Sequence, residues 1–553
     1  MVTKGGISRL EWRWWALGSA ALMILTSIPY WLGWRMETPD YAFSGFFVAV
    51  EDGNNYLAAM YQGAAGRWLF HNPYTPEPHA GIFANFVYLL LGKLARLSNL
   101  PPALVLHLAR VAAIPFLLLA LYRFVAHFTP WRAVRRLSWF LVAAGGGLGW
   151  LWVLAGGAFA PGVMPTDLWV PDASAFLTML TFPHLVLAQA SILWLAISGL
   201  RLLRHPNRRD GLGVALSALL LSLIHPYSPP ILVGLLTLHW AWQGWRSRAF
   251  AWKPLLRLGV AGATSLPFLV HALLVFQTDP VLRSWQEQNL VRSPHPLFYL
   301  LGFGLLGPLA LVGLLRRVPL SRQPDFSFLV LWMLVIPVLL YVPSNLQRRF
   351  LNGYQAPLVL MAICGLVVLL HRIRPGWRRR AVLIFKTIST FSNLLLLGGF
   401  ILLVMGRPPF VFNARPVLAA MDWLAAHAEA DAVVLAAYDT GNLLPARALV
   451  RSFVGHGPQS VHAEMRRDQV RAFFNGTLST EARLALLREH RVRYIFYGPS
   501  ERALGNASPA DLPGVQLIYD RDGVQIYEVQ YGVPTCQWCA APSHFPAGPL
   551  RVR

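Results

Sequence analysis

Eleven apolar segments, each of roughly membrane-spanning length, follow one another between residues 14 and 404. About 20 apolar helical residues cross the hydrocarbon core of a bilayer. Only 13% of the chain is charged, against about 25% in globular proteins, so it lacks the charged surface of a soluble protein. The sequence therefore predicts an α-helical polytopic membrane protein. The expected spans are 14–34, 103–127, 138–157, 180–203, 211–225, 230–245, 256–276, 297–315, 326–343, 356–371 and 381–404.

The distribution of basic residues predicts the orientation of these spans. The net charge is +23, and Lys and Arg collect in alternate loops, as they do in the cytoplasmic loops of membrane proteins. This pattern favours a membrane protein over a nucleic-acid-binding one. It places the N-terminus in the cytoplasm and the C-terminal region outside the cell membrane. The basic loops are 132–136, 201–209, 246–257, 316–322 and 372–380.

Segment 82–97 is the ambiguous element of this topology. It is apolar through Leu91 but carries Lys93 and Arg96. If it crossed the membrane, the charge bias would be inverted through the rest of the chain. We therefore expect a helix that lies at the outer interface.

A change of composition near residue 406 predicts a second domain. Charge rises, long apolar runs stop, and strand-like and helix-like segments alternate, which is typical of a small α/β domain. The expected domains are a membrane module over 1–405 with a long first outer loop over 35–102, an extracytoplasmic α/β domain over 406–530, and a Pro-rich tail over 531–553. Expected strands are 432–437, 494–497, 515–519 and 524–529, the last two joined by a turn at Asp520–Gly523, and expected helices are 461–474 and 480–490.

Three cysteines are too few for a disulfide framework. Cys364 lies in an apolar run and is expected in the core. Cys536 and Cys539, spaced as C-x-x-C, could form one short disulfide or half of a metal site.

The first outer loop contains candidate catalytic carboxylates. Glu51 and Asp52 follow an apolar stretch, and His79 lies further along the same loop. Long loops on a rigid scaffold often carry function, and a carboxylate at a membrane surface can act as a general base. The alternative is a solvated loop acid or an N-cap of a helix over 54–65.

The second outer loop adds acidic residues, and two later segments add histidines. Asp167 and Asp172 could bind a divalent cation or an acceptor hydroxyl, or could cap a helix that begins near Ser174. His184 and His225 each lie beside a proline at the outer end of an apolar helix. Ionisable groups at this depth are costly and tend to serve pathways or sites.

Arg348 and Arg349 stand on the sparsely basic outer side, between two spans. Guanidinium forks match phosphate oxygens, so a lipid headgroup or a lipid-linked phosphate is the expected ligand. A snorkelling interfacial anchor is the alternative. We find no nucleotide-binding motif, and Gly145–Gly147 inside an apolar run indicates close helix packing.

These features together resemble the C-type (GT-C) membrane glycosyltransferases, which take a sugar from a polyprenyl-phosphate carrier. The resemblance rests on the acidic first and second outer loops, on Gln347–Phe350, and on Thr440–Pro445 with Gly455–Gly457. The tandem acids of protein mannosyltransferases and the Trp-Trp-Asp motif of oligosaccharyltransferases are missing, so no subfamily follows.

The resemblance implies an inverting transfer to an acceptor hydroxyl on the outer membrane face. Asp52 or Glu51 matches the family's base, and Asp167 or Asp172 matches its second-loop acid. Arg348 and Arg349 would neutralise the lipid phosphate, with His184 and His225 holding the same phosphate or a metal. The acceptor would be a lipid, a glycan or a protein, and the one candidate cofactor is a divalent cation. The competing hypothesis is a transporter or flippase of lipid-linked sugar or lipid, although no repeated halves are found.

Overall fold

The computed structural model describes residues 7–316, 320 and 323–531, and these form two compact units. The first unit contains residues up to Leu32, Leu106–Leu273 and Leu290–Gly406, and the second contains Gly33–Val105, Leu274–Asn289 and the chain from Arg407. The first outer loop, expected in the membrane module, belongs to the same compact unit as the C-terminal segment. Cys536, Cys539 and the tail from 532 lie outside the described residues.

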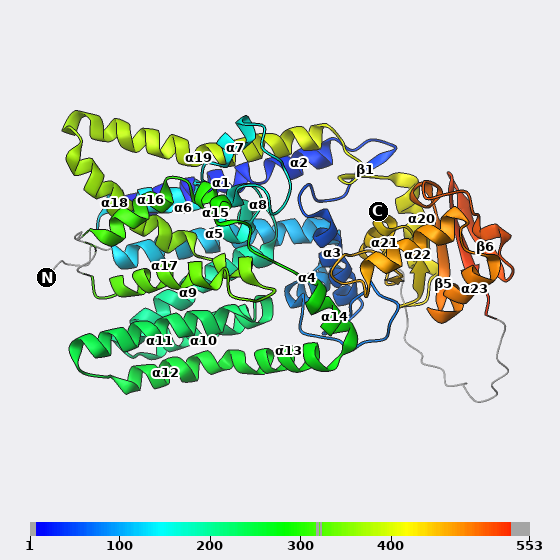
Figure 1. The fold of residues 1–553 in the computed structure, drawn as a ribbon, viewed down its shortest axis with the longest axis horizontal. Coiled ribbons are helices and arrows are strands. Elements are labelled where there is room, and N and C mark those ends of the chain that lie inside the picture. Colours follow the sequence, from blue (N-terminus) through cyan, green and yellow to red (C-terminus); the bar gives the residue numbers. More distant parts are fainter. Residues whose placement is uncertain (1–6, 317–319, 321–322, 532–553) are drawn as a thin grey trace. The chain divides into compact units, whose positions relative to one another are not determined.

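The first unit is built from helices, as predicted (Figure 1). Its helices, some of which run on into the second unit, are α1 (Arg9–Leu25), α2 (Ile28–Arg35), α5 (Pro102–Phe128), α6 (Arg132–Ala144), α7 (Gly149–Leu154), α8 (Ala175–Leu180), α9 (Pro183–Arg204), α10 (Arg208–Ile224), α11 (Ser228–Ser247), α12 (Trp252–Gly262), α13 (Leu266–Thr278), α15 (Pro296–Phe303), α16 (Leu306–Leu315), α17 (Phe326–Leu339), α18 (Gln355–Arg372) and α19 (Pro375–Met405).

Six helical segments in the described chain are long and apolar enough to cross a membrane by themselves. A seventh is counted if α15 and α16, which meet at 88°, form one span. The polytopic membrane fold is thus confirmed, while the expected number of eleven spans stays a prediction. The six segments are Arg9–Arg35, Pro102–Phe128, Pro183–Arg204, Trp252–Thr278, Gln355–Arg372 and Pro375–Met405.

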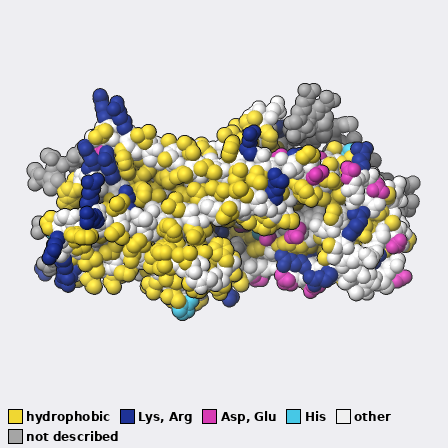
Figure 2. All heavy atoms as spheres, turned by 90° about the horizontal axis from the view of Figure 1, so that it is seen from above, with side chains coloured by type: hydrophobic (Ala, Val, Ile, Leu, Met, Phe, Trp, Pro, Cys, Tyr) yellow, Lys and Arg dark blue, Asp and Glu magenta, His cyan; other side chains and the backbone are white. Residues whose placement is uncertain are grey.

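The surface of the first unit separates apolar from basic side chains. Figure 2 shows hydrophobic side chains over most of its visible face, with Lys and Arg gathered at one end. The α11–α12 and α18–α19 turns, both in basic loops, lie at one end of this unit in Figure 1. This is the arrangement that the charge-based topology requires.

Glycines allow the helices of this unit to approach closely. A Cβ added to Gly313 of α16 would lie 2.1 Å from the carbonyl oxygen of Met361, and one added to Gly365 of α18 would lie 1.9 Å from that of Leu309. Close backbone contact replaces the hydrophobic driving force that is missing between helices in lipid.

The expected helical span over 138–157 is wrong, because the helix stops at Ala144. The backbone of Gly147 passes so close to α15 that a Cβ there would lie 2.3 Å from the carbonyl oxygen of Leu301. The amide of Leu148 donates to the same oxygen at 2.7 Å. The Gly145–Gly147 segment therefore interrupts the helix and lets the backbone contact α15. The expected role of these glycines, close packing within one continuous helix, is wrong.

The second unit is an α/β structure around a five-stranded sheet of order β4-β3-β5-β7-β6. β3 pairs in parallel with β4 and β5, while β7 pairs antiparallel with β5 and β6. The expected strands, hairpin and two C-terminal helices are confirmed, and β4 was not anticipated. The strands are β3 (Val433–Leu435), β4 (Arg451–Ser452), β5 (Val492–Tyr497), β6 (Val515–Arg521) and β7 (Val524–Val529), with helices α20 (Arg415–His427), α21 (Tyr438–Leu443), α22 (Ala463–Asn475), α23 (Thr480–Glu489) and α24 (Pro499–Arg502).

The first outer loop contributes its own elements to this unit. They are β1 (Tyr41–Phe43), α3 (Val50–Ala64) and α4 (Phe86–Ser98), and α14 (Pro280–Gln288) joins them from later in the chain. β1 pairs antiparallel with β2 (Phe412–Ala414). α3 and α4 meet through glycines: a Cβ on Gly63 would lie 2.1 Å from the oxygen of Leu89, and one on Gly92 would lie 1.9 Å from that of Met60. The segment 82–97 is thus a helix, as expected.

We predict that single cysteines placed in 372–380 react with an impermeant thiol reagent only after the membrane is opened. Cysteines placed in 440–520 should react in intact cells, because the charge pattern sets these regions on opposite sides. Labelling from the same side would contradict the topology.

Candidate active site

Glu51 and Asp52 lie in the first turn of α3, a position that favours negative charge because the helix amides point there. The helix begins at Val50, earlier than expected, and Ala49 precedes it in the left-handed region with φ 48°. The carboxylates therefore do not cap a helix over 54–65. Their side chains remain 43% and 52% exposed, so both can meet a molecule from solution.

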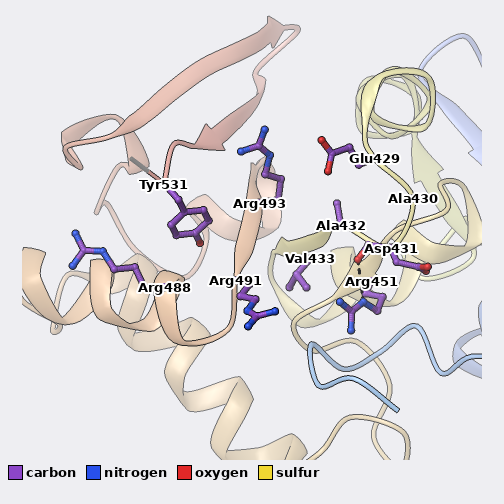
Figure 3. Close-up of a pocket in the computed structure, with 10 residues that line it drawn as sticks. All are labelled: Glu429, Ala430, Asp431, Ala432, Val433, Arg451, Arg488, Arg491, Arg493 and Tyr531. Atoms are coloured by element: carbon purple, nitrogen blue, oxygen red, sulfur yellow. Dashed lines mark hydrogen bonds between the residues drawn. The ribbon is translucent and has the colours of Figure 1, made fainter. Parts of the chain in front are cut away.

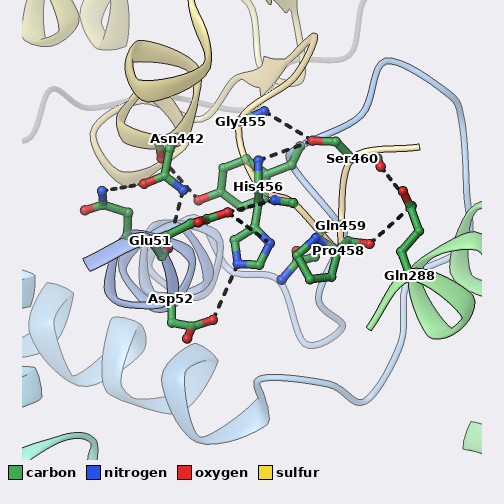
Figure 4. Close-up of polar contacts among 12 residues, drawn as sticks. Glu51, Asp52, Gln288, Asn442, Gly455, His456, Pro458, Gln459 and Ser460 are labelled. Carbon is green, nitrogen blue, oxygen red and sulfur yellow. Dashed lines mark hydrogen bonds and ion pairs between the residues drawn. The ribbon is translucent and has the colours of Figure 1, made fainter. Parts of the chain in front are cut away.

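His456 lies between these two carboxylates (Figure 4). Its Nδ1 is 3.8 Å from Glu51 Oε1, and its Nε2 is 3.5 Å from Asp52 Oδ1. The His456 side chain is only 6% exposed, and its ring lies 5.3 Å from that of Tyr74. Two acids and one imidazole from distant parts of the sequence thus form one cluster within the second unit.

The loop that carries His456 is held by its own hydrogen bonds. The amides of Gly455 and His456 both donate to Ser460 Oγ at 3.2 Å. Gln288 Nε2 donates to the carbonyl oxygen of Ser460 at 2.9 Å, and Asn72 Nδ2 donates to that of Gln459 at 2.7 Å. The imidazole is therefore positioned before any ligand arrives.

Glu51 and Asp52 differ in their surroundings. Glu51 Oε1 accepts hydrogen bonds from the Tyr438 hydroxyl and from the amide of Gly457, the latter at 2.7 Å. Burial raises the pKa of Tyr438, and the hydrogen bond to Glu51 raises it further, so this hydroxyl stays a donor. Glu51 is thus engaged in holding the 455–457 loop, whereas Asp52 is the more exposed of the two acids and lies 3.5 Å from His456 Nε2.

The cluster lies at the carboxyl ends of parallel strands, where ligands bind in open α/β sheets. Tyr438 begins α21 just after β3, and His456 follows β4. These two segments touch through glycines, since a Cβ on Gly441 would lie 2.0 Å from the oxygen of Val454. The segments Thr440–Pro445 and Gly455–Gly457 therefore pack against each other next to the carboxylates.

Polar contacts fasten the first loop to the C-terminal sheet. The amide of Ser452 in β4 donates to the oxygen of Pro73 at 2.8 Å, and Arg451 Nη1 donates to that of Pro76 at 2.8 Å. Arg466, with a side chain only 5% exposed, forms an ion pair with Glu77. These contacts hold α3 and its carboxylates against the loop of His456.

His79 lies elsewhere in the second unit. Its Nδ1 is 2.9 Å from the oxygen of Glu77, its ring centroid is 6.2 Å from that of His71, and burial lowers its pKa. Across the described residues, no group of three or more His, Cys, Asp or Glu side chains is arranged to hold a metal ion.

A second polar cluster lies in the first unit and gathers most of the expected phosphate ligands. Arg348 and Arg349 lie in a short 3₁₀ helix over Gln347–Leu351. Arg349 Nη1 is 3.3 Å from Asp172 Oδ2, and the Arg348 guanidinium lies 4.2 Å from the centre of the Trp169 ring. Asp172 is thus an ion-pair partner of Arg349, while Ser174 caps the following helix.

The two expected histidines lie beside this arginine pair. His225 Nδ1 is 3.0 Å from Asn352 Nδ2, and the His184 and His225 rings are 5.9 Å apart. His225 is buried, and the Arg349 guanidinium is close enough to interact with it electrostatically. Two guanidinium groups against one carboxylate leave the cluster with net positive charge, which suits a phosphate.

Asp167 has a different role from its neighbour Asp172. Its Oδ2 accepts from the amides of Gly147 at 2.8 Å and Gly149 at 3.2 Å, so it holds the broken backbone before α7. Burial raises the pKa of Asp167 to about 6. The structure thus brings Asp172 but not Asp167 to the arginine pair.

Comparison with solved structures identifies the fold. The archaeal oligosaccharyltransferase AglB from Archaeoglobus fulgidus, solved with an inhibitory peptide and a dolichol-phosphate, matches with a TM-score of 0.53 and 12% identity, over 96% of this chain and 76% of that one. The arabinofuranosyltransferase AftD from Mycobacteria matches with a TM-score of 0.53 and 14% identity, over 96% of this chain and 40% of that one.

The chain has the GT-C fold. The expected fold is therefore confirmed. No protein-family model and no curated protein matches the sequence.

His456 was not among the expected site residues, and neither were Tyr438 and Gln288. The segment Gly455–Gly457 was noted for its resemblance, but nothing in its local pattern pairs it with an acid 400 residues earlier. Two glycines around a histidine were the available signal.

We predict that Glu77→Gln loosens the first loop from the C-terminal sheet. The substitution removes the negative charge that pairs with the buried Arg466 guanidinium, and a hydrogen bond between charged groups contributes about 1.5–3 kcal/mol. Limited proteolysis should then cut within 65–85 faster than in the parent protein. Glu464→Gln is the matched control, because its pair with Arg467 is on the surface, with the Glu464 side chain 86% exposed. Equal cleavage rates in both variants would contradict the fastening role.

Proposed function

We propose that this protein is an integral membrane glycosyltransferase. It moves a sugar from a polyprenyl-phosphate carrier to an acceptor hydroxyl on the outer membrane face, with inversion at the anomeric carbon. The observation that carries the proposal is the cluster of Glu51, Asp52 and His456 in a chain with the GT-C fold. The neighbours named above are an oligosaccharyltransferase and an arabinofuranosyltransferase, and the former holds a dolichol-phosphate.

Asp52 is the proposed general base. Its carboxylate takes the proton of the acceptor hydroxyl while the hydroxyl oxygen bonds to the anomeric carbon. The bond between that carbon and the phosphate oxygen breaks, and its electron pair leaves with the polyprenyl phosphate. Glu51 positions the loop of His456, and His456 orients Asp52, in the way that a third group orients a base in other catalytic sets.

Arg348 and Arg349 are the proposed ligands of the donor phosphate. A lipid phosphate is a competent leaving group once its developing charge is balanced. Asp172 positions Arg349, while His184 and His225 with Asn352 complete the polar wall of this cluster. No nucleotide is needed, and the requirement for a divalent cation is tested by adding a chelator.

The test is transfer of label by the purified full-length protein. A panel of radiolabelled polyprenyl-phosphate sugars is incubated with lipid, glycan and protein acceptors, with and without chelator. Label should move to one class of acceptor. If the protein in liposomes instead carries the intact lipid-linked sugar across the bilayer, with no label on any acceptor, the transporter hypothesis is correct.

We predict that Asp52→Asn lowers the transfer rate by about 10²–10⁴-fold, because loss of a positioned base has that effect. Donor binding should be unchanged, since the substitution is nearly isosteric. Glu51→Gln should cost less, because its amide oxygen still accepts from Gly457. Full loss in Glu51→Gln with an active Asp52→Asn would move the role of base to Glu51, and activity in the double variant would contradict carboxylate catalysis.

We predict that Arg348→Lys or Arg349→Lys weakens donor use by at least about tenfold, since a charged hydrogen bond contributes about 1.5–3 kcal/mol and 1.4 kcal/mol is a factor of ten. Lysine keeps the charge but loses the planar fork. Arg292→Lys is the control, an exposed arginine of the same unit that the charge pattern predicts on the outer side. Donor kinetics that stay at the parent level in both variants and in their double would make the pair an interfacial anchor.

A further inference from the structure

A cleft of about 350 Å³ opens in the second unit, near the amino ends of the parallel strands (Figure 3). Its walls are the turn before β3 with the first residue of that strand, the first residue of β4, the end of α23 with the start of β5, and Tyr531, two residues beyond β7. The lining residues are Glu429, Ala430, Asp431, Ala432, Val433, Arg451, Arg488, Arg491, Arg493 and Tyr531.

This cleft is separate from the carboxylate cluster. Arg451 is the first residue of β4, and Arg491 immediately precedes β5, whereas His456 and Tyr438 follow β4 and β3. In parallel strands the two positions lie at opposite edges of the sheet. The cleft therefore has no part in the proposed proton transfer, and a binding role fits it better.

Positive charge dominates the lining, with four arginines against two acids. Asp431 pairs with Arg67 at 2.5 Å, which reduces its effect inside the cleft. Arg488 and Arg491 are exposed, and no hydrogen bond or ion pair of their side chains is found among the described residues. Two guanidinium groups are thus available to a ligand.

Three other lining side chains are held by hydrogen bonds or an ion pair. Arg451 Nε donates to the oxygen of Asp431 at 3.0 Å, and Arg493 Nη2 lies 2.9 Å from Glu528 Oε1. The Tyr531 hydroxyl donates to the oxygens of Leu487 at 2.7 Å and Val492 at 2.6 Å, so its ring is held in place. A site that is already ordered loses little conformational entropy when a ligand binds.

We propose that this cleft binds an acidic saccharide, a sugar unit that carries carboxylate or phosphate groups. Arg488 and Arg491 match such groups because the guanidinium fork fits both oxyanions. Glu429 is exposed and would repel a bare anion, but it can accept hydrogen bonds from sugar hydroxyls. The Tyr531 ring offers an apolar face to the sugar, and the volume is within the usual range for small-molecule sites.

Under the proposed function, on which this step rests, the acidic saccharide belongs to the acceptor. The cleft would hold an acidic part of the acceptor chain away from the reacting hydroxyl. Charge, and not sugar identity alone, would then decide which glycans are used.

Binding by the full-length protein in detergent, without any donor, tests the proposal. The probes are trigalacturonate, which carries carboxylates, glucose 6-phosphate, which carries a phosphate, and neutral maltotriose, each followed by calorimetry. We expect at least one acidic probe to bind at least about tenfold more tightly than maltotriose and to weaken as salt rises. The preferred acidic probe identifies the group that the cleft recognises.

We predict that the double variant Arg488→Gln/Arg491→Gln binds the preferred acidic probe at least about tenfold more weakly than the parent protein. The double variant Arg471→Gln/Arg521→Gln should bind it as the parent does. The control removes two exposed arginines of the same unit that lie outside the cleft. The proposal would be overturned if the parent protein bound maltotriose as tightly as both acidic probes. It would also be overturned if the cleft variant bound the acidic probe as tightly as the parent does. Because no donor is present, failure of sugar transfer alone would count against the proposed enzyme and not against this site.

Discussion

The proposed chemistry depends on the attachment of the first outer loop to the C-terminal sheet. Three kinds of contact fix α3, the helix that carries the carboxylates. They are the ion pair between Glu77 and the buried Arg466 guanidinium, the main-chain hydrogen bond from β4 to the loop, and the close packing of α3 on α4 at glycines. A carboxylate acts as a base only if it is held within reach of its proton, so the proposed role of Asp52 requires this attachment as well as the acid. The histidine that completes the cluster comes from the sheet side of the same attachment.

The cluster of Arg348, Arg349 and Asp172 keeps charged groups partly buried in a chain that has few of them. Asp172 is almost fully buried, and burial raises its pKa, while Arg349 and Arg348 oppose that shift. Breaking such a pair would leave an uncompensated charge, which is strongly destabilising. The Trp169 ring lies against the Arg348 guanidinium and orients it without neutralising it, while Asn352 contacts His225.

One sheet offers two different surfaces to ligands. At its carboxyl edge, acids and an imidazole lie within ion-pair distance, an arrangement suited to proton transfer. At its amino edge, unpaired guanidinium groups stand beside one exposed acid and an aromatic ring, an arrangement suited to binding a charged sugar. The two surfaces belong to one compact unit, so recognition and proton transfer can be tested separately by substitution.

The sequence alone determined the membrane class, most helix positions, the strands of the C-terminal domain and the arginine pair with its histidines, since hydrophobic period and charge bias are local signals. It failed at Gly145–Gly147, where a tertiary contact with Leu301 ends a helix that local apolarity favoured. It could not pair His456 with Asp52, nor assign Asp172 to Arg349 and Asp167 to the amides of Gly147 and Gly149. These pairings depend on contacts between residues more than a hundred positions apart, or on backbone geometry. Neither produces a repeating pattern of residue types that could be recognised in the sequence.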